Sequence, residues 1–356
     1  MSAEVLDAVE RIDPEELRDT ARRFLADRVE RPTAIATIGA DHGAALHGQV
    51  AELGWLLLTA PADRGGLGQS FEALAAIYEE MGRFLSPLTI APSMAAVDIL
   101  RDEEQVPGAD LLDRIVAGEA RVAIAFANAD TPSVDQRFEL VVGGVTATDL
   151  LLIPETDEGA VGLVDLRGAG VRVEPVETWD LTRIIADISL AATPVSTLAV
   201  NAAGATRIAR AHLDLANAWD SIGGAEQALE EAIGYMGTRK QFGRPIGSFQ
   251  ALKHRAADLK VGLEVARALA HRASAAYAER GEGWADLAGQ ARLLATDSYR
   301  AITEESVQFH GGIGFTWEHD CHLFLKRALL NEILGGAPEE VRDRVAVGVL
   351  GRGLRR

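Results

Sequence analysis

Residues 235–259 read YMGTRKQFGRPIGSFQALKHRAADL, and this stretch joins one long helical pattern to the next. Arg239 ends the first pattern, where a cation favours the negative end of the helix macrodipole. Gly243 can adopt the left-handed conformation that stops a helix, Pro245 cannot continue one, and Ser248 is expected to cap the next helix. The corner also offers a guanidinium, an aromatic ring and bare backbone, which suit a phosphate or a flat ring.

Ala-rich segments on both sides of this corner predict a helical bundle. Apolar residues recur at helical spacing over 197–236 and 247–280, and two more helical patterns cover 284–309 and 338–350. Alanine dominates the facing positions, and the joints between the patterns are short. Four such helices predict an antiparallel bundle.

The earlier sequence divides into a helical part and a short β part. Residues 1–120 predict helices, with a capped helix start at Asp13. Residues 121–195 are rich in Val, Ile and Phe, and Gly143-Gly144 separates two β-like runs as a hairpin turn would. The predicted fold class is therefore α+β, with an N-terminal helical domain, a small β middle domain and a C-terminal bundle over 196–356.

Composition narrows the classes of function. The 356 residues carry a formal net charge of -18, which argues against binding to nucleic acid or to an anionic membrane. The single cysteine, Cys321, cannot form a disulfide within the chain and favours a reducing, cytoplasmic compartment. The sequence shows no secretory signal and no apolar run of membrane length.

Three segments in this order resemble the flavin-dependent acyl-CoA dehydrogenases. They read LGWLLLTAPADRGGLGQSFEALAAIYEEMGRFLSP over 53–87, RKQFGRPIGSFQ over 239–250 and QFHGGIGFTWEHDCHLFLKRA over 308–328. The resemblance covers nearly the whole chain. It implies an acyl-CoA dehydrogenase-like fold, with an N-terminal helical domain, a β-barrel middle domain and a C-terminal four-helix bundle.

The resemblance also implies FAD as the cofactor. Arg239 matches the family arginine that reaches the pyrophosphate of a flavin held mainly by a neighbouring subunit, and Phe242 matches the aromatic residue beside the adenine. Gln250 matches a flavin-contact position on the next helix. The segment expected near the adenosine half consists of Gln308, Phe309, His310, Gly311 and Gly312. Arginine forks onto phosphate oxygens, and glycine lets backbone N–H groups approach an anion.

The carboxylate base of the family is missing from its usual places. The family removes the α-proton of an acyl-CoA with a carboxylate while hydride passes to the flavin, and an electron-transfer flavoprotein is the expected acceptor. Gly335 stands where most members have a glutamate. Other members carry the base about seven helical turns before the corner arginine, near Leu213 here. Asp214 and Glu339 lie nearby, but both are better explained as ordinary helix acids.

The middle domain also departs from the family. Residues 126–132, FANADTP, replace a Thr- and Gly-rich segment that lines flavin and substrate, and only 142–145 remains of a later strand. Some bacterial members are heterotetramers in which a short, base-lacking subunit completes the flavin site of its partner. Residues 179–183 and 316–320 resemble that subclass, which includes enzymes of sterol side chains.

The sequence therefore predicts an FAD-binding subunit of an acyl-CoA dehydrogenase that acts on a sterol- or lipid-derived thioester. It is expected to lack its own base and to complete the flavin site of a second subunit. One alternative is a homo-oligomeric dehydrogenase with its base relocated to Asp214 or Glu339. Another is a flavin-free structural or binding protein on the same scaffold.

A short acidic and histidine-rich run raises a metal site as a further possibility. His319, Cys321 and His322 lie together, with Glu318 and Asp320 between them. The run lacks a second cluster with ligand spacing, and the family match explains it as packing beside the flavin end. No metal is predicted.

Overall fold

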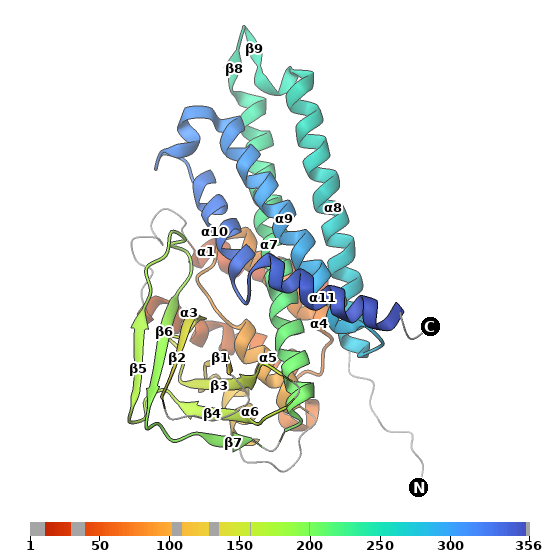
Figure 1. Ribbon diagram of the computed structural model, residues 1–356. Helices are drawn as coiled ribbons and strands as arrows, with labels where there is room; N and C mark the ends of the chain where they lie inside the picture. Colours follow the sequence, from red (N-terminus) through yellow and green to blue (C-terminus); the bar gives the residue numbers. More distant parts are fainter. Residues whose placement is uncertain are drawn as a thin grey trace.

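A computed structural model describes residues 11–29, 40–101, 109–127, 135–156, 158–198 and 200–353. Helices from both ends of the chain enclose one side of a sheet-containing middle region, and the long bundle helices extend beyond it (Figure 1). The first ten residues and most of the 126–132 segment lie outside the described residues. No described helix combines the length and apolarity that would let it cross a membrane.

The N-terminal region is helical, as predicted. Asp13 caps the first helix, and its carboxylate accepts the backbone N–H of Glu15 at 2.9 Å. Helix α4 is buried along nearly its whole length and packs against α1 and α7. The helices are α1 (Pro14–Arg28), α3 (Ala40–Glu52), α4 (Phe71–Arg83), α5 (Ala91–Leu100) and α6 (Ala109–Val116), with short 3-10 turns at Trp55–Leu57 and Ala62–Arg64.

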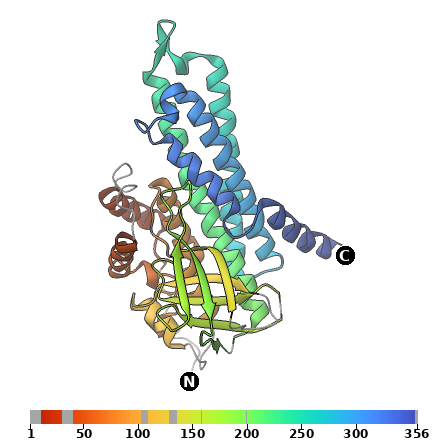
Figure 2. The ribbon, with the colours of Figure 1, turned by 60° about the vertical axis from the view of Figure 1, so that its left-hand side comes forward.

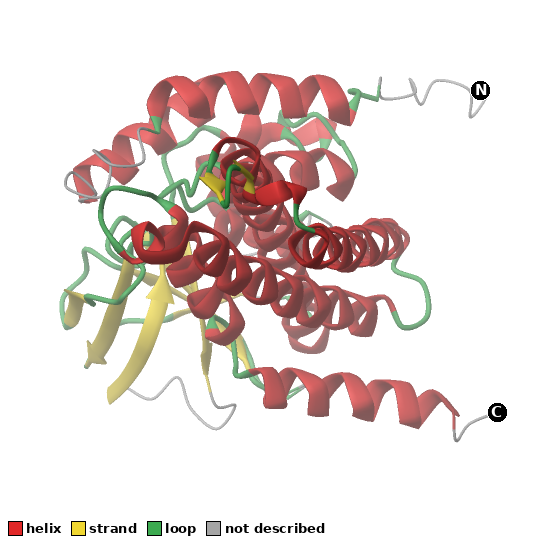
Figure 3. Cartoon of the chain, turned by 90° about the horizontal axis from the view of Figure 1, so that it is seen from above, coloured by secondary structure: helices red, strands yellow, loops and turns green. Residues whose placement is uncertain are grey.

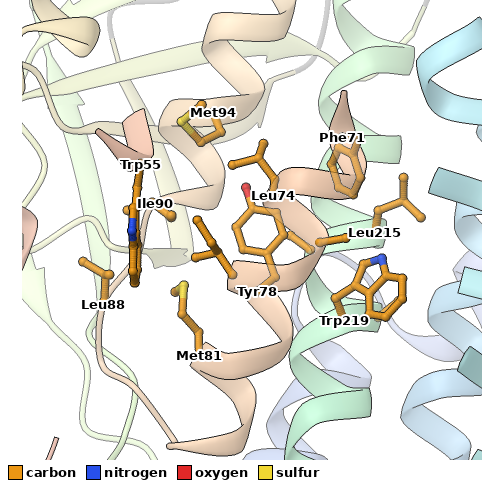
Figure 4. Close-up of a cluster of buried hydrophobic side chains, with 14 of the residues drawn as sticks. Trp55, Phe71, Leu74, Tyr78, Met81, Leu88, Ile90, Met94, Leu215 and Trp219 are labelled. Carbon is orange, nitrogen blue, oxygen red and sulfur yellow. The ribbon is translucent and has the colours of Figure 1, made fainter. Parts of the chain in front are cut away.

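Side chains of α4 build the largest hydrophobic core together with α5 and α7. Figure 4 shows Leu74, Tyr78 and Met81 of α4 beside Met94 of α5, with Trp219 on the neighbouring α7. Ala-rich faces on the bundle helices continue the same core. Burial of these faces explains why the helical spacing of apolar residues predicted them well.

The middle region contains two sheets, in agreement with the predicted α+β fold class. One sheet has the order β1-β3-β4-β7 and the other β2-β6-β5, and their facing side chains share a core (Figure 2). Strands β1 and β3 are parallel, and the other pairs are antiparallel. The strands are β1 (Val122–Ala127), β2 (Asp135–Val142), β3 (Asp149–Pro154), β4 (Val161–Asp165), β5 (Val171–Pro175), β6 (Ile185–Ala191) and β7 (Ser196–Leu198).

The hairpin expected at Gly143-Gly144 is wrong. Strand β2, before these glycines, pairs with β6, whereas β3, after them, pairs with β1 and β4. Gly143 has a φ of 74°, and its backbone turns the chain from one sheet into the other. A glycine pair marks a turn in sequence, but it does not say whether the flanking strands pair.

The C-terminal bundle contains one helix that the sequence analysis did not assign. Helix α10 packs against α7 and α9, whereas α11, expected to be the fourth bundle helix, contacts mainly α9 and extends away from the bundle axis. Figure 3 shows α7 to α10 clustered, with α11 at one side and the strands at another. The helices are α7 (Ala202–Thr238), α8 (Gln250–Glu279), α9 (Trp284–His310), α10 (Cys321–Ile333) and α11 (Pro338–Gly353).

The corner that opened the sequence analysis is a small hairpin. Strand β8 (Lys240–Gln241) pairs with β9 (Arg244–Pro245), and the two residues between them, Phe242 and Gly243, have φ values of 51° and 80°. Two left-handed residues in sequence form the turn type that suits a two-residue hairpin. Gly243 therefore turns this hairpin, and it does not stop α7, which ends at Thr238.

Ser248 does not cap the helix that follows. Its hydroxyl donates to the carbonyl of Pro245 at 2.7 Å, and it lies in a 3-10 turn over Ile246–Ser248. Helix α8 begins at Gln250 without a side-chain cap. The extra turn moves the helix start two residues beyond the predicted cap.

Two glycines let α4 and α7 touch through their backbones. A Cβ on Gly223 would lie 1.8 Å from the carbonyl oxygen of Glu79, and one on Gly82 would lie 1.9 Å from that of Asp220. Neither carbonyl can retreat without bending a buried helix. The α4–α7 crossing therefore requires glycine at both positions.

We expect Gly223→Ala to lower the free energy of unfolding by at least about 2 kcal/mol, because overpacking forces the helices apart. Gly234→Ala is a matched control on the same helix, since nothing lies within 4 Å of its Cβ position. It should raise stability by about 0.5–1 kcal/mol. Urea unfolding measures the free energy of unfolding of both variants. Equal changes in the two would contradict the backbone contact between α4 and α7 at Gly223.

Candidate active site

A cavity of about 590 Å³ lies where the N-terminal helices, both sheets and the bundle meet. Its volume is in the range of pockets that hold small organic ligands. Much of its wall is apolar, and Tyr78, Met81, Leu88 and Ile90 contribute to it from α4 and the following connection (Figure 4). The remaining walls come from β1, β2, α7 and the loop between α10 and α11.

Both positions at which the sequence analysis looked for a base line this cavity. Leu213 lines it from α7, and Gly335 lines it from the loop after α10. Gly335 and Gly336 both have positive φ values, 80° and 118°, which most side chains adopt only with strain. The structure thus brings together two residues that are 122 positions apart in number (335 − 213), and neither can accept a proton.

The cavity wall contains two carboxylates among its described residues, Asp220 and Glu139. Glu139 lies at an exposed edge of β2, 3.8 Å from Arg137. Asp220 is buried and bound by Arg327 at 2.6 Å and by Arg183 at 3.0 Å. Burial alone would raise the pKa of Asp220, but the two guanidinium groups outweigh it and lower that pKa to about 2.

Asp220 is therefore a poor general base near neutral pH. Its Oδ2 also accepts a hydrogen bond from Asn331 Nδ2 at 2.8 Å, so both oxygens are occupied. A useful base has a pKa near the working pH and a free lone pair directed at the substrate. Asp220 instead neutralises two buried cations.

The Asp220 pair belongs to a larger buried network that sequence analysis missed as a unit. Arg327 of α10 donates to Asp220 on α7, to the carbonyl oxygen of Ser86, and to Thr182 between β5 and β6. Arg183 reaches both Asp220 and Asn331. The spacing of these residues in the sequence does not indicate that they are in contact. The family-like segments 179–183 and 308–328 contain Arg183 and Arg327 and were the available signal for them.

Neither alternative base candidate lies on the cavity wall. The Asp214 carboxylate is buried and accepts from Arg292 at 3.1 Å and from Arg344 at 2.8 Å. Arg292 in turn donates to the carbonyl oxygens of Gly335 and Gly336 at 3.3 and 2.8 Å, so this ion pair holds the loop after α10. Glu339 is exposed on the first turn of α11, 3.5 Å from Arg342.

The expected flavin-contact residues lie elsewhere, at the far end of the bundle. Arg239 and Gln250 are exposed beside the β8–β9 hairpin, and Phe242 at its tip is 92% exposed (Figure 1). None of the eight predicted contacts lines the cavity.

The second group of predicted contacts lies at the end of α9 and divides into two kinds. Gln308, Gly311 and Gly312 are exposed. Phe309 and His310 are buried, and Phe309 packs with Met236 and Ala256. These two buried residues can approach a ligand through their backbone, but their side chains face the interior.

The helical N-terminal region, the sheet-containing middle region and the C-terminal helices together have the acyl-CoA dehydrogenase fold. The model of the acyl-CoA dehydrogenase N-terminal domain matches residues 13–105, and that of the C-terminal domain matches residues 206–350. Acyl-CoA dehydrogenase IpdE2 of Mycobacterium tuberculosis is 32% identical over 343 residues, which is 93% of this chain and 96% of that protein. The chain belongs to the acyl-CoA dehydrogenase family of oxidoreductases.

One further relative and one solved structure are also similar to this chain. Acyl-CoA dehydrogenase FadE34 of Mycobacterium tuberculosis is 32% identical over 305 residues, so the match spans 84% of this chain but only 41% of that longer protein. A solved structure described as the Tcur3481-Tcur3483 steroid ACAD G363A variant has a TM-score of 0.83 at 23% identity. The match covers 96% of this chain and 98% of that one, and it supports the fold.

Replacing Asp220 tests the buried network. Asp220→Asn should lower the free energy of unfolding at pH 7 by about 3 kcal/mol, because two buried guanidinium groups lose their counterion. The lowered pKa also predicts a pH effect. The carboxylate contributes fully above about pH 4, and that contribution disappears as the pH falls towards 2.

Unfolding curves measured from pH 7 to pH 2 should therefore converge for wild type and Asp220→Asn at the acid end. Exposed Asp297→Asn is a suitable control, since its carboxylate lies 4.0 Å from an exposed Arg342. A constant difference between wild type and Asp220→Asn at every pH would contradict the assignment.

Proposed function

We propose that this chain is the FAD-binding subunit of a hetero-oligomeric acyl-CoA dehydrogenase whose partner subunit supplies the catalytic base. The observation that carries the proposal is that Gly335 and Leu213 both face the cavity. They occupy the two positions to which the family resemblance assigns the base. Neither side chain can accept the α-proton of a substrate.

The chemistry of the family explains why this loss matters. The α-proton of a thioester is weakly acidic, so its removal needs a base held against it in a dry pocket. Bound FAD accepts the hydride that leaves the neighbouring carbon. This chain's cavity offers apolar walls and two carboxylates: Asp220, which is already bound to two arginines, and Glu139, which is exposed beside Arg137. Its residues can shape a pocket, but they do not move the substrate proton.

The corner residues fit the diphosphate and adenine of FAD. The guanidinium of Arg239 is exposed, and a planar fork of donors suits phosphate oxygens. Phe242 is held outward by a left-handed turn, so that its ring is free to stack on a flat base. Nothing lies within 4 Å of a Cβ built on Gly311 or Gly312, which leaves bare backbone for a close approach.

The separation between corner and cavity supports a shared site. A flavin whose ring occupied this chain's own cavity would be gripped by the cavity walls, and none of the corner residues is among them. The resemblance assigns Arg239 to a flavin held by another subunit. The corner of this chain then completes the partner's site, where the base is present.

Sterol-derived thioesters are the proposed substrates of the assembled enzyme. The solved structure of similar fold is described as a steroid ACAD. Residues 179–183 and 316–320 resemble the subclass that includes enzymes of sterol side chains. No described contact favours relocation of the base to Asp214 or Glu339.

The cofactor assignment predicts a selective loss of FAD. In the complex of this chain with its base-containing partner, Arg239→Ala should weaken FAD binding by about tenfold or more, as expected for loss of a charge-assisted contact. Lys240→Ala is the control, because it removes the adjacent exposed cation. FAD content and affinity are measured by absorbance and fluorescence. Equal losses in both variants, or a colourless wild-type complex, would count against the assignment.

The assignment of the base predicts how activity divides between the subunits. Flavin reduction by a steroid acyl-CoA should require the complex, and the lone chain loaded with FAD should show none. Glu339→Gln in this chain should leave the rate unchanged, since Glu339 is exposed and away from the cavity. Stopped-flow absorbance measures each reduction rate. Rapid reduction in the lone chain would refute the proposed division.

A further inference from the structure

Two histidines and the single cysteine of the chain meet where α9 ends and α10 begins. His310 is the last residue of α9, and Cys321 is the first residue of α10. His319 lies in the connection between the two helices. One nitrogen of each histidine and the sulfur of Cys321 all lie within 4.8 Å of one another.

His310 carries a nitrogen lone pair that its surroundings leave unused. Its Nδ1 lies 2.7 Å from the carbonyl oxygen of Ser306, and a carbonyl only accepts, so Nδ1 carries the proton. Nε2 therefore bears the lone pair. This atom is buried and has no hydrogen-bond partner among the described residues. His310 as a whole is only 3% exposed, so bulk water does not supply that partner. A buried polar atom without a partner is costly and calls for an explanation.

The other two residues are held by weak contacts that a stronger partner can replace. The Cys321 thiol lies 3.4 Å from the carbonyl oxygen of Gly314. The backbone N–H of Cys321 donates to Nδ1 of His319 at 3.2 Å, so a metal that binds this nitrogen must displace that hydrogen bond. Cys321 is buried, and His319 is partly buried. The donors thus converge in a site largely shielded from water.

Ring packing is the simpler explanation of this cluster, but it is incomplete. The ring of His310 lies 4.5 Å from that of Tyr235 and 4.0 Å from that of His319, measured between centroids. These contacts account for the burial of the rings. They give no hydrogen-bond partner to Nε2 of His310, whose ring lies beside two other potential metal ligands.

We propose that His310, His319 and Cys321 bind a zinc ion, with water in a fourth position. Two imidazole nitrogens and a thiolate are a donor set that zinc accepts in tetrahedral geometry. In such a site the three ligand atoms would lie roughly 3.4–3.6 Å apart, so the present spacing must close by about 1 Å. The thiol loses its proton to solvent when the metal binds.

The site would join two helices across an exposed turn. The connection carries Gly311 and Gly312 together with Phe315 and Trp317, which are 78% and 68% exposed. Fixing both ends of this turn limits its conformations in the folded protein. The inference does not depend on the proposed flavin role, because the ligands are defined by their own geometry.

The sequence analysis considered a different group of residues as metal ligands. His319, Cys321 and His322 are close in sequence, but the ring of His322 packs on Trp317, 4.8 Å away, and lies outside the cluster. His310 comes from the preceding helix. Its arrival beside His319 depends on how the chain folds back between α9 and α10.

The test uses the purified full-length chain, freed of metal and kept reduced, titrated with Co²⁺ as a spectroscopic substitute for zinc. We expect one Co²⁺ per chain, a charge-transfer band from a cobalt–thiolate bond, and the intense visible bands of a tetrahedral site. Zinc should displace the cobalt. Cys321→Ser should abolish the charge-transfer band, and His319→Ala should weaken binding beyond the roughly 10–100-fold that loss of an outer partner costs.

His322→Ala is the matched control and should bind Co²⁺ like the wild type. Circular dichroism and thermal unfolding of the metal-free variants verify that each one folds. If Cys321→Ser does not fold, His319→Ala provides the test, because His319 is partly exposed. Binding without a thiolate band, no stoichiometric binding, or equal weakening in His319→Ala and His322→Ala would overturn the proposal. Loss of FAD with intact Co²⁺ binding would concern the flavin role alone.

Discussion

The ion pair between Arg327 and Asp220 holds together the parts of the molecule that surround the cavity. Arg327 is fully buried, and its guanidinium reaches α7, the connection after α4 and the loop between β5 and β6. Its charge is tolerable in the interior because Asp220 lies 2.6 Å away. A buried pair of this kind adds little net stability, but removing one partner leaves a costly isolated charge. The arrangement of helices and sheets around the cavity therefore depends on both residues being present.

This constraint also decides what the cavity can do. Asp220 is the buried carboxylate on the cavity wall, and both of its oxygens already accept hydrogen bonds, one from Arg327 and one from Asn331. The ion pair between Asp214 and Arg292 likewise stabilises the loop of Gly335 and Gly336, and Glu139, the other carboxylate on the cavity wall, lies at an exposed edge beside Arg137. The chain thus retains the architecture of a dehydrogenase and an exposed corner that we propose binds the cofactor, while Asp214 and Asp220 stabilise the fold. A division of labour between two unlike subunits accounts for both features.

Local sequence signals predicted where the helices lie better than they predicted which strands pair. The Asp13 cap and the apolar spacing of the long helices are local signals, and burial of one face makes them reliable. Gly243 was recognised as a left-handed residue, but its role in a hairpin turn depends on backbone pairing with residues that follow it. The predicted hairpin at Gly143 was wrong for the same reason, because the strands on either side of it pair with other strands of the chain. Pairing across long distances is set by the whole fold, and no short pattern contains it.

The cavity positions of Leu213 and Gly335 were anticipated from the family resemblance, whereas the buried ion-pair networks around the cavity were not. Arg327, Asp220 and Arg183 come from separate parts of the chain, and each is an ordinary charged residue when considered alone. An experimental structure of the complex with bound FAD and an acyl-CoA tests the central claim most directly. The account predicts that Arg239 contacts the diphosphate of a flavin whose ring lies in the partner subunit, facing a carboxylate of that partner. A flavin ring within this chain's own cavity, with a carboxylate of this chain within hydrogen-bond reach of the substrate α-carbon, would contradict it.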